Sequence, residues 1–209
     1  MRNLLAIRTG LPFRTYALLA SFAFVLPILV WAVFSYGGYA KPLFLPSPSL
    51  VLAALVRTFR DGVLFNDILI SLYRVSAGFV LSAVIAVPLG ILMGTFVSVE
   101  ALQEPFVDFV RYMPAAAFIP LIMLYVGIGE WAKILVIFIG TYFQLILMVM
   151  ENSRGVPLEL LNVSYTLGAS RWQVLTRVVL PGAMPGIFES LRMTLGWAWT
   201  YLVVAELVA

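Results

Sequence analysis

The stretch that decides the fold is Val75–Val99, which reads VSAGFVLSAVIAVPLGILMGTFVSV and carries no charge between Arg74 and Glu100. A helix needs about 20 mostly apolar residues to cross a bilayer, and residues 75–96 can supply them. The whole chain has the same character, because 63% of its residues are hydrophobic and 11% are charged, with a mean hydropathy of +1.04. A soluble domain has roughly 45–50% apolar and about 25% charged residues. The sequence therefore predicts a membrane protein.

The same length criterion predicts four further spans, so the expected fold class is an all-α, polytopic membrane bundle with five crossings. These spans lie at about residues 16–36, 109–128, 131–150 and 191–209. Prolines inside spans are tolerated where neighbouring helices satisfy the freed backbone groups. No internal repeat or low-complexity linker divides the chain, so residues 1–209 are interpreted as one transmembrane domain.

Basic residues predict the orientation, because the cytoplasmic flanks of membrane spans carry an excess of Lys and Arg. Arginines precede the first span and gather again between the fourth and fifth spans, at Arg2, Arg8, Arg14, Arg154, Arg171 and Arg177. An even number of crossings separates the two groups, so both are expected on the cytoplasmic side. Residues 1–15 are then a cytoplasmic segment that leads into a retained span and not a removed signal peptide.

The loop after the first span predicts a short helix at about residues 48–61 on the outer side. Ser47 can cap this helix and Pro48 suits its first position. Its apolar residues form one stripe opposite Arg57 and Arg60. Such a helix lies in the membrane interface or packs on its own bundle, and the sequence leaves both open.

Composition excludes several kinds of chemistry. The chain has no cysteine and no histidine, which excludes thiol catalysis, disulfides, Cys-type zinc sites and His-based acid–base work. It has no phosphate-binding loop of the G-x-x-x-x-G-K-[ST] type, so we expect it not to be an ATPase itself. A net charge of +3 that is spread along the chain gives no nucleic-acid footprint.

A compact polar element at about residues 157–182 separates the last two predicted spans. Gly168 fits a left-handed helix C-cap, and Ser170 with Gln173 forms a capping box that starts a second helix. Pro181–Gly182 is expected to end that helix. Two short helices joined at a tight corner can fit a groove on a soluble partner, or the element is simply an interfacial loop.

This element resembles the cytoplasmic signature of ABC-importer permeases, which has a Glu-Ala-Ala triplet, a glycine four residues later and a distant Ile-x-Leu-Pro. Gly168 matches the glycine, and Val178, Leu180 and Pro181 match the tail. The triplet falls on Asn162, Val163 and Ser164, so its acidic residue is missing. Further blocks are similar to the nitrate, sulfonate, taurine and bicarbonate branch of these permeases, from about residue 45 onward: LPSPSLVLAAL, SLYRVSAGFVLSAVIAVPLGILMG, FIPLIMLYVGIGEWAKILVIF and LGWAWTYLVVAEL.

The resemblance implies a type I ABC importer permease of the MetI-like fold, with five spans visible of an expected six. It implies a multi-pass protein of the bacterial inner membrane that pairs with a second permease copy, two ATPase subunits that carry ATP and Mg, and a periplasmic solute-binding protein. The element at 157–182 becomes the coupling element. Its candidate ATPase contacts are Asn162, Tyr165, Gly168, Ala169, Ser170, Arg171 and Trp172. Trp172 can instead anchor at the lipid headgroups.

Polar residues inside the spans are candidates for the translocation path. They are Arg111, Tyr112, Gln144, Thr200, Tyr201 and Glu206. Each has a plainer interpretation: Arg111 can snorkel to the interface, the uncharged groups can bond across helices, and Glu206 can pair with Arg74 or Arg111. Glu130 and Lys133 are interpreted as a surface helical pair.

The expected function is inward transport of a small anion of the nitrate, bicarbonate, sulfonate or taurine type. One alternative is a permease of the same branch for a heterocyclic vitamin precursor. Another is a carrier driven by an ion gradient, which predicts internal repeats and buried acids. An intramembrane enzyme would need a catalytic constellation that the sequence lacks.

Overall fold

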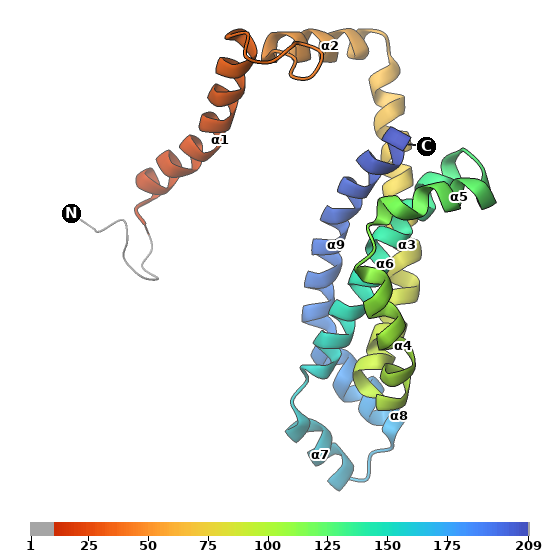
Figure 1. Ribbon diagram of the computed structural model, residues 1–209. Helices are drawn as coiled ribbons and strands as arrows, with labels where there is room; N and C mark the ends of the chain where they lie inside the picture. The colour runs from red at the N-terminus through yellow and green to blue at the C-terminus, as the bar shows by residue number, and fades with distance from the viewer. Residues whose placement is uncertain (1–10, 209) are drawn as a thin grey trace. The chain divides into compact units, whose positions relative to one another are not determined.

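The computed structural model describes residues 11–208, and within that range it is built from helices joined by short links (Figure 1). The elements in chain order are α1 (Phe13–Tyr36), α2 (Pro48–Arg60), α3 (Val63–Thr95), α4 (Val97–Arg111), η1 (Ala115–Phe118), α5 (Ile119–Val126), α6 (Glu130–Arg154), α7 (Leu158–Thr166), α8 (Arg171–Val174), η2 (Leu175–Val179) and α9 (Leu180–Val208). The chain divides into two units, Met1–Asp67 and Ile68–Ala209. Residues 1–10 of the expected cytoplasmic segment lie outside the described residues.

Unit 1 holds α1, α2 and the link between them. The link folds back on α1, because the Trp31 Nε1 donates to the Pro46 carbonyl at 3.0 Å and the Ser35 hydroxyl to the Leu45 carbonyl at 3.2 Å. Ser47 caps α2 and Pro48 occupies its first turn, which confirms the predicted helix start. None of the residues of α2 is buried.

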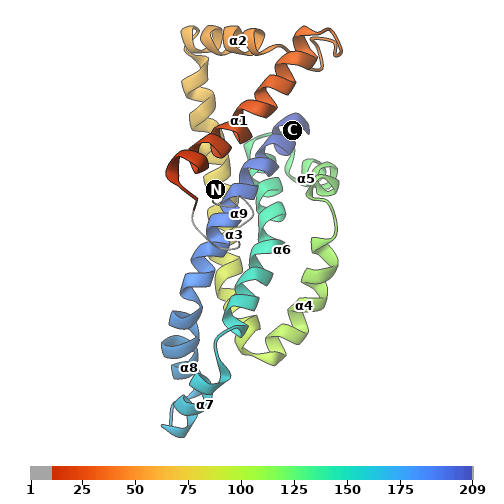
Figure 2. The ribbon, with the colours of Figure 1, turned by 90° about the vertical axis from the view of Figure 1, so that its left-hand side faces the viewer.

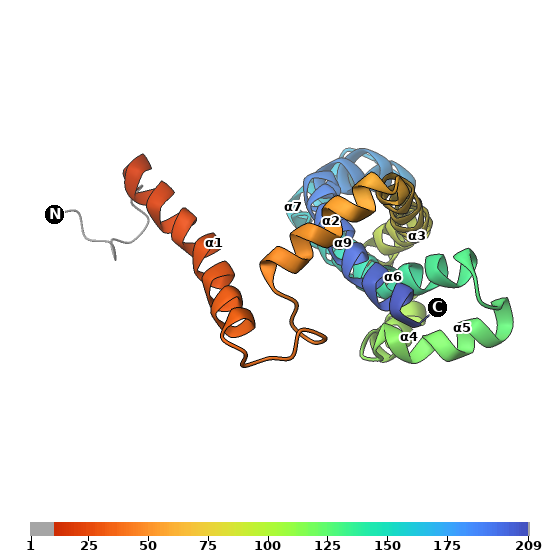
Figure 3. The same ribbon diagram turned by 90° about the horizontal axis from the view of Figure 1, so that it is seen from above.

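Unit 2 is arranged around α6. This helix packs along α9 over much of its length, and seen from above it lies between α3 and the α4–α5 pair (Figure 3). The α7–α8 corner lies at one end of unit 2, where α4 begins, and α5 lies at the opposite end (Figure 2). α6 therefore contacts elements from both halves of the unit, and it has more buried residues than any other helix in the described range.

The main core of unit 2 joins α3, α4, α6, η2 and α9. Its fully buried members include Met93 of α3, Val107 of α4 and Ile146 of α6. In a bilayer such packing holds helices together by van der Waals contact, because lipid tails are as apolar as the core itself. The core thus fixes α6 against α9 and against α4.

The third predicted span, at residues 109–128, is wrong as a straight helix. The chain bends by 93° between Val97–Arg111 and Ala115–Val126. Pro114 causes the break, because a proline lacks an N–H and pushes the residue before it out of the helical region. The predicted residues are apolar enough to cross a membrane, but they belong to two helices that point in different directions.

Three helices, α1, α3 and α6, are long and apolar enough to cross a membrane, and the bent pair makes a fourth if it is one span. The fifth predicted span lies in α9, whose Arg192, Glu206 and aromatic residues dilute its apolar ones. α9 is not among the helices that meet the criterion, so its crossing stays a prediction.

The expected end of the second short helix at Pro181–Gly182 is wrong. α8 continues through η2, a π-helical segment, into α9, so one helix runs from Arg171 to Val208. The wider π turn accommodates Pro181, since that ring would otherwise clash with the carbonyl four residues earlier. The predicted coupling element is therefore continuous with α9.

Replacement of Ile146 by alanine tests the core around α6. Ile146 is fully buried, so the truncation leaves a cavity in the core. We expect a loss of about 2 kcal/mol in the free energy of unfolding. This value is at the low end for Ile→Ala, because the side chain of a separated helix would contact lipid and not water. Thermal unfolding in detergent measures it. Leu124→Ala is the control, since Leu124 is exposed, and an equal loss in both variants would contradict this assignment.

Candidate functional site

The α7–α8 corner is closed by a complete Schellman motif. The Gly168 N–H donates to the Tyr165 carbonyl at 2.9 Å and the Ala169 N–H to the Ser164 carbonyl at 3.0 Å. Gly168 has φ +83°, a left-handed conformation that glycine adopts at no steric cost. The predicted C-cap is confirmed.

Directly after this turn, Ser170 starts α8 through a capping box. The Gln173 N–H donates to the Ser170 hydroxyl at 3.4 Å, and the Ser170 N–H donates to the Gln173 side-chain carbonyl at 2.8 Å. The chain therefore turns from α7 to α8 with its terminal backbone groups paired, and the corner has a defined shape.

The tip of the corner carries exposed apolar and basic side chains. Val163, Tyr165, Leu167 and Trp172 are exposed, as is Arg171. A hollow of about 330 Å³ lies behind the tip, lined by Ser164, Leu167, Gly168, Ala169, Gln173, Arg177 and Val178. The structure thus brings the predicted coupling residues together on one corner, and of these only Ala169 is partly covered.

One aromatic contact and one ion pair lie where the corner meets the rest of unit 2. Trp172 meets Phe96 edge-on, with ring centroids 6.0 Å apart. Arg154 at the end of α6 pairs with Glu100 of α4. Sequence reasoning did not identify the Arg154–Glu100 pair, because only the fold brings residues so distant in the chain together.

Three adjoining cavities lie along α6 and α9, and we call them together the polar seam. Four of the predicted path residues line it: Arg111, Gln144, Thr200 and Tyr201. Gln144 lines all three cavities, Arg111 two of them and Tyr201 two. The largest has a volume of about 460 Å³ and is also lined by Asn152, Glu189 and Ser190. A polar strip of this kind is not expected to face lipid.

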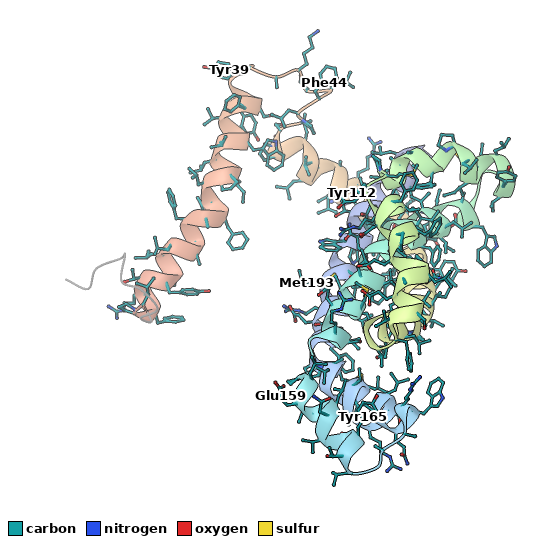
Figure 4. All side chains as sticks on the ribbon, turned by 60° about the horizontal axis from the view of Figure 1, so that its bottom comes forward. Tyr39, Phe44, Tyr112, Glu159, Tyr165 and Met193 are labelled. Atoms are coloured by element: carbon teal, nitrogen blue, oxygen red, sulfur yellow. The ribbon has the colours of Figure 1, made fainter. Side chains whose placement is uncertain are left out.

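Arg111 and Tyr112 lie at the break between α4 and η1. The Arg111 guanidinium stands 4.8 Å from the centre of the Tyr112 ring, and its Nη2 donates to the Tyr112 hydroxyl at 3.1 Å. Tyr112 itself is exposed and does not line the cavities described here. Figure 4 shows Tyr112 on the same side of unit 2 as Met193, which does line the cavity of about 460 Å³.

Glu206 lies apart from the polar seam, in an ion cluster with Arg74 and Glu130. Arg74 Nε and Nη2 each donate at 2.6 Å to the two oxygens of Glu130, and Arg74 Nη1 donates at 2.6 Å to Glu206. Ser71 also donates to Glu206, at 3.2 Å. Two roles were considered for Glu206, a place on the translocation path and an ion pair with an arginine. In the structure Glu206 forms the ion pair, with Arg74.

Glu130 makes its ion-pair contact with Arg74, and Lys133 contributes only a longer-range attraction to the same carboxylate. A bidentate arginine contact is stronger than an exposed pair one helical turn apart. The Arg74 cluster joins α3, α6 and α9, and the Arg74 side chain is only 12% exposed. Its members are separated widely in sequence, so only the fold could identify the three-way contact.

Comparison with known proteins identifies the family. A family model described as "binding-protein-dependent transport system inner membrane component" matches residues 86–209. The chain belongs to this family. The taurine transport system permease of Escherichia coli is 34% identical over 87% of this chain and 68% of its own length. The bicarbonate transport system permease of Synechococcus elongatus is 32% identical over 87% and 68%.

A solved structure shares the fold. The inward-facing MetNI methionine ABC transporter matches 64% of this chain and 68% of its own with a TM-score of 0.57 and 24% identity. The permease fold predicted from the coupling signature is thereby confirmed.

Removal of the charges of the Arg74 cluster, one at a time and together, tests whether the cluster stabilises the fold. Arg74→Gln leaves two neighbouring carboxylates without their cation, and we expect a loss of about 1–3 kcal/mol of stability. Glu206→Gln should cost less, because Arg74 keeps Glu130. The triple variant Arg74→Gln, Glu130→Gln, Glu206→Gln should regain much of the loss.

Thermal unfolding of the purified permease in detergent measures all three variants. Arg57→Gln in α2 is the control for removal of an exposed cation. A triple variant less stable than Arg74→Gln alone would contradict the assignment of the cluster as an ion triad.

Proposed function

We propose that this permease is the membrane subunit of an ATP-driven importer that moves a small anion from the periplasm to the cytoplasm. Two copies of the chain form the path, two separate ATPase subunits supply ATP and Mg, and a periplasmic binding protein delivers the solute. The observation that carries the proposal is the α7–α8 corner, a rigid pair of capped helices continuous with α9.

The corner has the composition of a docking surface. Exposed aromatic and arginine side chains supply most binding energy at protein interfaces, and Trp172, Tyr165 and Arg171 have that character. The aspartate or glutamate of the family triplet is absent at Asn162, so the proposed contact depends on apolar knobs and arginines. We assign the ATPase to this surface and the N-terminus to the same, cytoplasmic side.

Movement at the corner can reach the path through α9. The helix from Arg171 to Val208 carries the corner at one end and Thr200 and Tyr201 of the polar seam near the other. When the ATPases close on ATP, a shift of the corner would move α9 and open the seam toward the outside.

The polar seam supports a path between two copies. Lipid cannot satisfy polar side chains at membrane depth, so the seam needs either water or a second permease against it. The named relatives transport taurine and bicarbonate, both small solutes with an anionic group, and we extend that solute class to this chain.

Substitution of Gly168 tests the coupling corner. Gly168→Val places a β-branched side chain at φ +83°, which strains the turn, and we expect the ATPase to be lost from the purified complex. Gly168→Asn is the matched control, because asparagine tolerates this conformation. Masses of the proteins that co-purify with each form give the result.

Retention of the ATPase by Gly168→Val would contradict the docking assignment. Uptake by cells depleted of ATP while the ion gradient is held tests the energy source separately. Uptake should stop, and persistence would favour an ion-coupled carrier.

A further inference from the structure

We propose that Arg111 recognises the anionic group of the solute in the polar seam, and that Asp108 is the counter-ion which this group displaces. The exchange restricts the seam to small anions that carry one negative charge. This inference rests on the proposed function and adds a residue-level selectivity to it.

Arg111 is placed to meet a solute. It ends α4 at a 93° break between two apolar helices, and irregular backbone inside a membrane must be covered by protein or line a water-filled cavity. It lines both the cavity of about 460 Å³ and the small cavity beside Tyr201. Among the described residues that line these cavities, Arg111 is the one cation.

The Arg111 guanidinium has N–H groups that make no hydrogen bond to the described residues. Its Nε is buried and has no well-directed acceptor among the described residues, although a carboxylate oxygen of Asp108 lies 2.9 Å away. The Asp108 contact is therefore a charge contact and not an aligned hydrogen bond. One Nη2 hydrogen goes to the Tyr112 hydroxyl, and the remaining N–H groups can bind an oxyanion in the forked geometry that arginine favours.

Asp108 can leave Arg111 without a large penalty. Its side chain is 43% exposed, so water can hydrate the carboxylate once it turns away. The pair lies one helical turn apart on α4, where exposed ion pairs are weak. An incoming anion therefore competes with a weak internal partner.

The other carboxylates of the cavity have partners of their own. Glu189 pairs with Arg192 at 2.6 Å, and Glu151 lies 4.0 Å from Arg154. Their repulsion of a passing anion is thereby reduced. Arg111 is therefore the cation in the polar seam that can bind an anion. The Gln144 amide, which lines the same cavities, can donate a further hydrogen bond to that anion.

Charge count sets the selectivity. A monoanion at Arg111 neutralises the guanidinium, while the displaced Asp108 carboxylate stays hydrated at its exposed position. A dianion adds a second negative charge beside that carboxylate with no cation to pair it, which is unfavourable in a partly desolvated cavity. The seam should therefore accept a sulfonate or bicarbonate and reject sulfate.

Anion binding to the purified permease–ATPase complex, without the binding protein, tests the inference. Trp197 lines the cavity shared with Gln144, so its fluorescence can report binding, with Trp197→Phe to identify the signal. Methanesulfonate is the monoanion probe and sulfate the dianion. We expect methanesulfonate to bind at least tenfold more tightly than sulfate.

Three variants sharpen the result. Arg111→Gln should weaken methanesulfonate binding at least tenfold, and Arg111→Lys, which keeps the charge without the fork, should weaken it less. Asp108→Asn should tighten methanesulfonate binding and reduce the discrimination against sulfate. Lys133→Gln, on the same helix as Gln144 but outside these cavities, should change neither.

Unchanged affinity in Arg111→Gln, equal binding of the two anions, or no response of wild-type protein to methanesulfonate would each overturn the inference. Co-purified ATPase in every variant shows that the complex is intact. ATP-driven uptake by the wild type tests the proposed function independently, so a failure of the anion site leaves that function standing.

Discussion

A hydrocarbon environment offers no hydrogen-bond partners, and this constraint governs where the chain can be irregular. The long helices satisfy their own backbone, and the departures from them fall in a few places. The Schellman turn at Gly168 pairs its own groups, and the π segment Leu175–Val179 keeps the helix unbroken. The break after Arg111 lies beside the cavities of the polar seam.

The same constraint keeps α9 continuous with the start of the corner. Because α8, η2 and α9 form one helix, one side of the α7–α8 corner and Thr200 and Tyr201 of the polar seam belong to a single element. α6 packs along it and carries Gln144 between the two ends. The Arg74 cluster ties α9 to α3 and α6. A displacement at the corner therefore has a continuous, packed route to the seam.

Much of this arrangement could be predicted from the sequence, where the signals are local. Uncharged runs identified α1, α3 and α6, and capping residues identified the corner at Gly168 and Ser170. The bend at Pro114 was missed because hydropathy counts apolar residues and does not see direction. The continuity through Pro181 was missed because proline ends most helices and a π turn has no sequence signature. Contacts such as Arg74 with Glu130 depend on the fold.

The central claim is that the corner and α9 move as one body, and distances between spin labels test it most directly. The chain has no cysteine, so labels at Leu160→Cys on α7 and Val203→Cys on α9, both exposed and outside the tip of the corner, are the only label sites in the permease. Pulsed electron paramagnetic resonance on the permease–ATPase complex gives the distance with and without ATP. An unchanged distance is predicted. A change on ATP binding would place a hinge between the corner and the seam and contradict the account.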